Sequence, residues 1–284
     1  MKILAVGDLV GESGVKKLKE ELPKIKQQEN IDFIIVNAEN AAGGMGITTK
    51  IYNELTDLGV DVITMGNHTW GKKDIFSFID NDNIIRPANY SKKVPGHGYG
   101  IYTCKSETNM GALKNWAQNT NPEHSNREKK HQAKRICVVN LIGRTDMNVQ
   151  SENPFLKMQE IIEEVKGKAD IIILDFHAEA TAEKIAMAYY LDGKVTAIFG
   201  THTHVQTADE QILENGTAFI TDIGMTGPKK SVIGMDVGVS IKRFETTLPE
   251  KYKLAEGNCI LNGCIFEIND ETCRVNKITR ISRK

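Results

Sequence analysis

Side chains that commonly bind transition metals follow short apolar runs at five places in this sequence. They are Asp8, Glu39 with Asn40, Asn67 with His68, His177, and His202 with His204. Imidazole nitrogens and carboxylate or amide oxygens suit such metals, and polar residues at the ends of buried parallel strands meet at one edge of a sheet. The pattern therefore predicts a metalloenzyme whose site is assembled from several strand ends.

Two of these places carry histidine motifs. Gly200-Thr201-His202-Thr203-His204 follows the apolar run from Val195 to Phe199, and a turn there can bring both rings to one site. A lone histidine is more often a hydrogen-bonded core or surface residue, but the other strand-end residues favour the metal interpretation. The turn Met65-Gly66-Asn67-His68-Thr69 sets Asn67 beside His68, which predicts a metal ligand next to an acid.

The two carboxylates have different predicted roles. Glu39 is the candidate for a ligand shared by two cations, because a carboxylate offers two oxygens and its charge reduces the repulsion between the ions. For Asp8 there is an alternative, a helix cap or Asx turn before a helix that begins near Gly14.

The elements that must position these residues alternate between strands and helices, as in βαβ units. Helices are predicted around residues 15–25, at 51–58 before Gly59, from Pro154 with Phe155, Met158, Ile161, Ile162 and Val165 inward, and from a Thr181 cap towards Asp192 with Ile185, Ala188 and Tyr189 buried. Strands are predicted at 3–6, 33–36, 60–65, 136–141, 171–176, 195–199 and 218–221, and after Pro228 only strands, at 237–241, 259–268 and 273–281. We expect a sandwich of two sheets with helices outside, in one domain over residues 1–284, because the candidate ligands span positions 8 to 204 and must converge.

Residues 105–135 depart from this pattern. Seven lysines and arginines against three glutamates give them a net charge of 7 − 3 = +4, and no apolar periodicity is present. Such a segment is typical of a solvated, flexible loop, and it predicts a basic insertion in the domain. An RNA-contacting arm is the alternative interpretation.

Composition excludes some classes of protein. The net charge of −1 argues against a general polyanion-binding protein, although it does not exclude a local basic patch. The five cysteines form no CxxC pair, which is typical of reduced thiols in the cytoplasm. No signal peptide or membrane span is predicted, so we expect a soluble cytoplasmic protein without a membrane partner.

Six strings in order along the chain resemble those of the calcineurin-like metallophosphoesterases and, more narrowly, of the YmdB-like family of bacterial phosphodiesterases. The strings are GDLVG at 7–11, NAEN at 37–40, TMGNHTWG at 64–71, DFHAEATAEK at 175–184, FGTHTHVQTAD at 199–209 and ITDIGMTGP at 220–228. The resemblance implies an α/β fold, a four-layer α/β/β/α sandwich of two mixed sheets flanked by helices. It also implies a site for two divalent or trivalent metal ions, most often iron in this family.

Carried over residue by residue, the resemblance assigns Asp8, Glu39, Asn40 and His204 to one metal and Glu39, Asn67, His177 and His202 to the other. His68 is then the general acid. The chain departs from the wider superfamily in having Val10 where Asp-x-His would place a histidine, and Glu39 where the bridging residue is Asp. Both departures are those of the YmdB-like branch. Thr69 follows His68 where the superfamily often has Asp, which leaves open what orients the His68 ring.

The implied reaction is hydrolysis of a 2′,3′-cyclic nucleotide at the 2′ bond to give a 3′-nucleotide. Two cations about 3.5–4 Å apart bind a bridging hydroxide that attacks phosphorus, while His68 protonates the departing oxygen.

The same site suits phosphomonoesters or RNA phosphodiesters, and a regulatory protein that contacts RNA through residues 105–135 is an alternative of another class. The ligand types suit iron, manganese or zinc equally, so iron rests on the resemblance. Assembly into homo-oligomers is common among soluble enzymes of this size.

Overall fold

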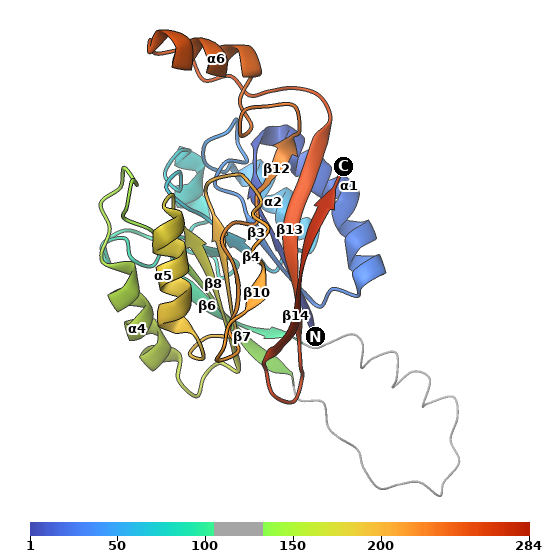
Figure 1. The fold of residues 1–284 in the computed structure, drawn as a ribbon, viewed down its shortest axis with the longest axis vertical. Coiled ribbons are helices and arrows are strands. Elements are labelled where there is room, and N and C mark those ends of the chain that lie inside the picture. The colour runs from blue at the N-terminus through green and yellow to red at the C-terminus, as the bar shows by residue number, and fades with distance from the viewer. Residues whose placement is uncertain (105–132) are drawn as a thin grey trace, which may run out of the picture.

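The computed structural model describes residues 1–104 and 133–284, and its strands form two mixed sheets (Figure 1). The first sheet contains, in spatial order, β2 (Asp8–Leu9), β12 (Met225–Pro228), β13 (Cys259–Ile268), β1 (Lys2–Val6), β3 (Phe33–Asn37), β4 (Val62–Thr64) and β5 (Ile84–Ile85), with β14 (Val275–Arg283) paired to β13. The second contains β10 (Gln211–Ile212), β11 (Ala218–Ile220), β9 (Ala197–Thr201), β8 (Ile171–His177), β7 (Lys134–Ile142) and β6 (Tyr99–Cys104).

Helices cover the outer face of each sheet. The helices α1 (Gly11–Glu29) and α2 (Thr49–Asp57) pack on the first sheet, and α4 (Pro154–Val165) and α5 (Thr181–Leu191) pack on the second, on the opposite side of the molecule in Figure 1. A short 3-10 helix, η1 (Lys73–Ser77), follows β4. This four-layer arrangement confirms the fold class predicted from the sequence.

The central strands are buried on both faces, which explains their unbroken apolar runs. In β1, Leu4 and Val6 pack with the helices outside the first sheet, whereas Ile3 and Ala5 point between the sheets. Side chains alternate along a strand, so one run of five residues supplies both layers of core. Between the sheets, Phe199 and Phe266 lie with their ring centroids 6.4 Å apart.

Parallel pairing brings the candidate ligands to one edge of the sandwich. β1, β3 and β4 are parallel neighbours, as are β7, β8 and β9. The carboxyl ends of these strands therefore point the same way, and the residues that follow them meet in the loops beyond. The predicted helix near Gly14 begins at Gly11 without a side-chain cap, so the alternative role of Asp8 as a cap is wrong.

All four predicted helices form, and local chemistry explains where they start. Asn153 accepts hydrogen bonds from the amides of Phe155 and Leu156 at the start of α4, and Pro154 takes the first turn, where its missing N–H costs nothing. Two details of α5 were predicted wrongly. The cap is Ala180 rather than Thr181, and Tyr189 is 65% exposed, because the buried face runs instead through Lys184, Met187, Ala188 and Leu191.

The expectation that only strands follow Pro228 is also wrong. The run predicted as a strand at 237–241 begins a helix, α6 (Val237–Thr246), which projects from the body of the molecule (Figure 1). Asp236 caps it by accepting a hydrogen bond of 3.0 Å from the Val239 amide. The β-branched residues suggested a strand, but a capping carboxylate favours the helix, as does the lack of a neighbouring strand in the described ranges of the chain.

The basic segment predicted at 105–135 lies mainly outside the described residues, as does its predicted contact with RNA. At its end, Lys134 and Arg135 already belong to β7, where Arg135 forms an ion pair of 2.8 Å with Asp170. Within 1–104 and 133–284, no helix is both long and apolar enough to cross a membrane.

Candidate metal centre

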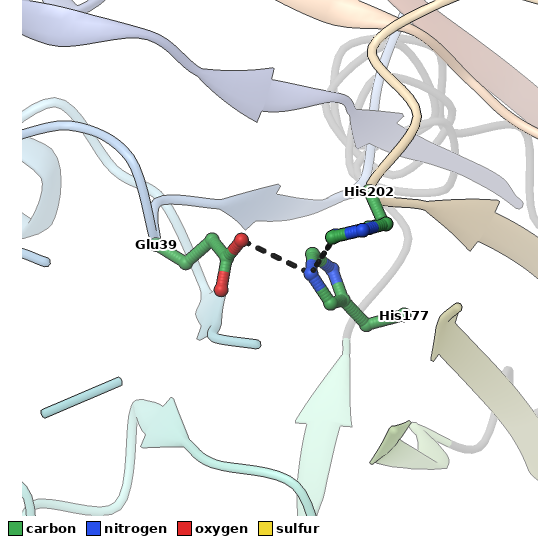
Figure 2. Close-up of side chains that lie close together, drawn as sticks. All are labelled: Glu39, His177 and His202. Carbon is green, nitrogen blue, oxygen red and sulfur yellow. Dashed lines mark hydrogen bonds and ion pairs between the residues drawn. The ribbon is translucent and has the colours of Figure 1, made fainter. Parts of the chain in front are cut away.

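Four potential ligand atoms converge at His177, which ends β8 and is fully buried. Its Nε2 lies 2.9 Å from Oδ1 of Asn67, 3.0 Å from Oε1 of Glu39 and 3.0 Å from Nδ1 of His202. Figure 2 shows Glu39, His177 and His202 pointing toward one another from three separate segments. One ring nitrogen carries at most one proton, so hydrogen bonding satisfies only one of these three contacts at a time.

Hydrogen bonds on the far side of the His177 and His202 rings determine which ring nitrogens are bare, that is, carry no proton in the neutral ring. Thr201 Oγ1 donates its only proton to Asp175, at 2.7 Å, and so accepts from Nδ1 of His177, at 2.9 Å. His202 Nε2 lies 3.1 Å from a carboxylate oxygen of Glu179, which can only accept, so the proton of the neutral ring stays on Nε2. In the neutral rings, Nε2 of His177 and Nδ1 of His202 then face each other with lone pairs. A cation between them removes this repulsion, and carboxylates behind metal-bound histidines are a common arrangement.

The charges around this point act strongly on each other. Burial lowers the pKa of His177, but Glu39, Asp8 and Asp175 outweigh that effect and raise the pKa to about 9. Burial raises the pKa of Glu39, but His177 and His68 lower it further, to about 2. Burial and the charge of His177 together lower the pKa of His202 to about 3. Without a metal, a proton on His177 therefore supplies the positive charge that the site requires.

Gly66 is needed because the ligands pass so close to its backbone. A Cβ atom built on Gly66 would lie 2.4 Å from Oε2 of Glu39 and 2.5 Å from the His177 ring, in both cases too close for any side chain. The same turn brings the His68 amide within 2.8 Å of Oε2 of Glu39. Thr69 Oγ1 donates to the Gly66 carbonyl at 2.6 Å, and the Gly71 amide donates to the His68 carbonyl at 2.9 Å. These bonds fix the backbone that presents His68 beside Glu39.

Asp8 and Asn40 each carry a buried oxygen that lacks a hydrogen-bond partner among the described residues. Oδ1 of both side chains is inaccessible to solvent and accepts no hydrogen bond from the part of the chain that the structure describes. Their other atoms are satisfied, since Oδ2 of Asp8 accepts from the His202 amide and Nδ2 of Asn40 donates to the Gly44 carbonyl. Burial raises the pKa of Asp8, an effect that His204 and His177 oppose. Buried unpaired oxygens are costly, and a bound cation would satisfy both.

The His204 ring, like that of His177, has its Nδ1 next to an oxygen that accepts a hydrogen bond. Its Nδ1 lies 2.8 Å from the Ile233 carbonyl, which can only accept, so Nδ1 carries the proton and Nε2 is bare. His202 and His204 both have positive φ angles, 98° and 66°, which non-glycine residues rarely adopt. Thr203 lies between these two residues, in the loop that follows β9.

The structure thus places all eight predicted site residues at one edge of the sandwich. Glu39, Asn67, His177 and His202 surround a single point, while Asp8, Asn40 and His204 each offer a free atom in the adjoining loops. His68 joins them through its amide bond to Glu39. Nitrogen and oxygen ligands of these types fit a transition-metal site.

Comparison with known proteins identifies the family of the chain. The model of a family described as "YmdB-like protein" matches residues 4–127 and 113–281. The chain belongs to the YmdB-like family. Its relatives include the 2′,3′-cyclic-nucleotide 2′-phosphodiesterase of Bacillus subtilis, 45% identical over 282 residues that cover 99% of this chain and 96% of the relative. A putative phosphatase/phosphodiesterase of Mycoplasma pneumoniae is 36% identical over 99% of this chain and 92% of its own length.

Solved structures of the same fold cover the whole chain. A novel phosphatase from Mycoplasma pneumoniae superposes with a TM-score of 0.84 at 34% identity, covering 100% of this chain and 93% of the other. A hypothetical protein from Thermus thermophilus superposes with a TM-score of 0.83 at 32% identity, covering 100% and 99%. Together with the family match, these findings confirm the resemblance and the prediction that the chain is an enzyme of the phosphoesterase class.

The YmdB-like site also depends on residues to which the sequence analysis assigned no role. Asp175, Thr201 and Glu179 hydrogen-bond to the candidate ligand histidines or to their partners, and Lys184 and Asp222 bond to the loop that carries two of them. A signal for Asp175 was present, because residues two apart on a strand share a face and Asp175 precedes His177 by two. The others act through bonds between segments far apart in the chain, for which the sequence carries no marker.

Proposed function

We propose that this chain is a metal-dependent phosphodiesterase that opens 2′,3′-cyclic nucleotides at the 2′ bond and releases 3′-nucleotides. The observation that carries the proposal is the convergence of Nε2 of His177 and Nδ1 of His202, 3.0 Å apart, with Oε1 of Glu39 and Oδ1 of Asn67, because four such donor atoms around one point suit a bound cation. The substrate is inferred from the similarity to the Bacillus subtilis phosphodiesterase, which extends over 99% of this chain.

Two metal ions fit the available donors. Glu39, Asn67, His177 and His202 would hold one, and Asp8, Asn40 and His204 would hold the second together with Glu39. We propose iron for both positions, with manganese as the alternative that the same nitrogen and oxygen ligands accept. When bound, such ions supply Lewis-acid chemistry, in that they acidify water and stabilise negative charge on a phosphate.

His68 is the residue of this chain that we assign to proton transfer. Water adds to phosphorus and releases one proton to solvent, the bond from phosphorus to the 2′ oxygen breaks, and the 2′ oxygen takes a proton from the His68 ring. The neutral ring then recovers a proton from solvent, which completes the cycle. The bond between the His68 amide and Glu39 supports this role, because it fixes the residue within one hydrogen bond of a shared ligand.

Apolar side chains beside the ligand loops support a substrate with a nucleobase. The Tyr252 ring lies against Gly44, whose carbonyl accepts from Asn40, and is 45% exposed. Ile233, whose carbonyl accepts from His204, and Val205, the next residue after His204, are also exposed. Aromatic and apolar surface of this kind stacks with nucleobases and offers nothing to a bare phosphate ester.

The test is a product analysis with defined metals. Metal-stripped protein, reloaded separately with ferrous iron or manganese, is incubated with 2′,3′-cyclic AMP, and the monophosphates are separated by chromatography. We expect 3′-AMP in metal-loaded samples and no turnover in the stripped control. Release of 2′-AMP would contradict the assigned bond, and no turnover with either metal would contradict the proposed activity.

A further inference from the structure

A buried ion pair lies directly behind the loop that carries His202 and His204. Lys184 on α5 is 1% exposed, and its Nζ donates to Oδ2 of Asp222, which is fully buried, at 2.8 Å. The same Nζ donates to the Thr201 carbonyl, also at 2.8 Å. The ammonium group of Lys184 is therefore bonded to Thr201, the residue immediately before His202.

Asp222 is bonded to the same loop on the other side of that histidine. Its Oδ2 accepts from the Thr203 amide at 3.1 Å and from the Thr203 hydroxyl at 2.8 Å, while Oδ1 accepts from the Gly224 amide at 2.8 Å. Thr203 separates the two ligand histidines. The pair therefore bonds to the chain both before and after His202.

The loop requires such support because of its backbone conformation. The φ angles of 98° at His202 and 66° at His204 lie in a region that side chains with a Cβ disfavour. Residues keep such conformations only where surrounding contacts determine them, and these regions often occur at functional sites. The bonds of Lys184 and Asp222 flank His202, where the more unusual of the two angles occurs.

Stability alone does not explain a charged pair at this position. Removing two charges from water costs more than an ion pair usually returns, and apolar replacements of such pairs are often neutral or stabilising. The rest of the buried face of α5 consists of Met187, Ala188 and Leu191, so an apolar residue at position 184 would extend an existing core. A directional role is the better explanation of the charges.

We propose that Lys184 and Asp222 are positioning residues that hold His202, Thr203 and His204 in the conformation that binds metal. The inference rests on the proposed metal centre. Neither residue touches a reacting atom in this scheme. They contribute by orienting the imidazole rings of His202 and His204, which are assigned to different metal ions. Residues behind metal ligands typically change metal affinity by 10- to 100-fold when replaced.

The test measures metal affinity directly, without substrate. In Lys184→Met/Asp222→Asn both charges are removed together, so neither is left buried and unpaired. Manganese is titrated into stripped protein and the free ion is followed by electron paramagnetic resonance. We expect 10- to 100-fold weaker binding, with the circular dichroism of the folded metal-free protein unchanged. Affinity equal to that of the unmodified protein would overturn the proposal.

A matched control separates positioning from general loss of a buried lysine. Lys157 on α4 is similarly buried, at 6% exposure, and pairs with Glu152 and Glu160 at 2.7 Å each. Lys157→Met should leave manganese affinity unchanged, even if it lowers thermal stability. An equal loss of affinity in this control would show that the effect at Lys184 is not specific, and would also overturn the proposal.

A milder variant covers the case in which the double replacement does not fold. Thr203→Val removes the hydroxyl that donates to Asp222, together with its long 3.5 Å bond from the Val205 amide, and leaves the ion pair intact. We expect several-fold weaker manganese binding in protein that keeps its thermal stability, and unchanged binding would count against the inference. Because affinity is measured without nucleotide, the inference fails or stands separately from the proposed 2′-phosphodiesterase activity.

Discussion

Nε2 of His177 lies 3.0 Å from Oε1 of Glu39, although β8, which ends at His177, and β3, which precedes Glu39, belong to different sheets. Two atoms bound to one ion at about 2.1 Å would lie about 3.0 Å apart at right angles and about 3.4 Å apart in a tetrahedral site. The spacing therefore suits two ligands of a common cation as well as it suits an ion pair. The His177 and Glu39 side chains therefore have a separation that is compatible with binding one metal ion.

Replacing His68 should separate catalysis from metal binding. In His68→Ala the backbone amide that bonds to Glu39 remains, so the metal ligands keep their arrangement. Loss of the proton donor should reduce kcat by about 10²- to 10⁴-fold. Steady-state kinetics and metal analysis of the same preparation test this expectation. A variant that loses its metal together with its activity would show that His68 has a structural role instead.

Replacing Asp8 by Asn should have opposite effects with and without metal. Asp8 is fully buried and its Oδ1 has no hydrogen-bond partner in the described part of the chain, so its charge is costly when no cation is present. We expect Asp8→Asn to melt at a higher temperature than the unmodified protein in a chelator, and at a lower temperature with saturating metal. Each kcal/mol corresponds to about 2–4 °C in a chain of this size. Calorimetry with and without chelator would refute the idea if the sign did not change.

Removing the Thr201 hydroxyl should weaken metal binding through the His177 ring. Thr201→Val deletes the bond that holds the proton on Nδ1 of His177 and leaves Asp175 without one of its donors. We expect affinity for manganese to fall by about 10- to 100-fold. Thr217→Val is the matched control, since it deletes an equally buried hydroxyl that bonds to Val195 and Gly193, away from the ligands. Equal losses in both variants would exclude a specific effect on His177.

Tyr252 should affect recognition of the nucleobase and spare the chemistry. Stacking of a base on an aromatic ring contributes about 1–3 kcal/mol, which corresponds to roughly 5- to 150-fold in affinity. We expect Tyr252→Ala to raise the KM for 2′,3′-cyclic AMP by a factor in that range, with little change for ribose 2,3-cyclic phosphate, which lacks a base. Tyr189→Ala, which removes an exposed tyrosine from α5, provides the control. A parallel change for both substrates would argue against stacking.

Apolar patterning was sufficient to predict the central strands, because buried parallel strands show unbroken runs of Ile, Val, Leu and Phe. It missed β6 and the short strands β2, β5, β10 and β12, which have no such run. The same patterning failed at Val237–Thr246, where a β-branched run forms α6. There the capping bond from Val239 to Asp236, and the absence of a pairing strand among the described residues, decide the conformation. At Tyr189 the error came from assigning the buried face of α5 by hydropathy, which gives a lysine no reason to face inward.

The amino-acid sequence determined which residues end the strands, and so which side chains meet at one edge of the sandwich. The apolar runs and the polar residues that follow them are local features of the chain, and they are enough to identify Asp8, Glu39, His177 and the other candidate ligands. Only the tertiary structure decided which ring nitrogens are bare and what holds the His202 loop. Those depend on single hydrogen bonds, from Thr201, Glu179, Lys184 and Asp222, between segments that become neighbours only after both sheets have formed.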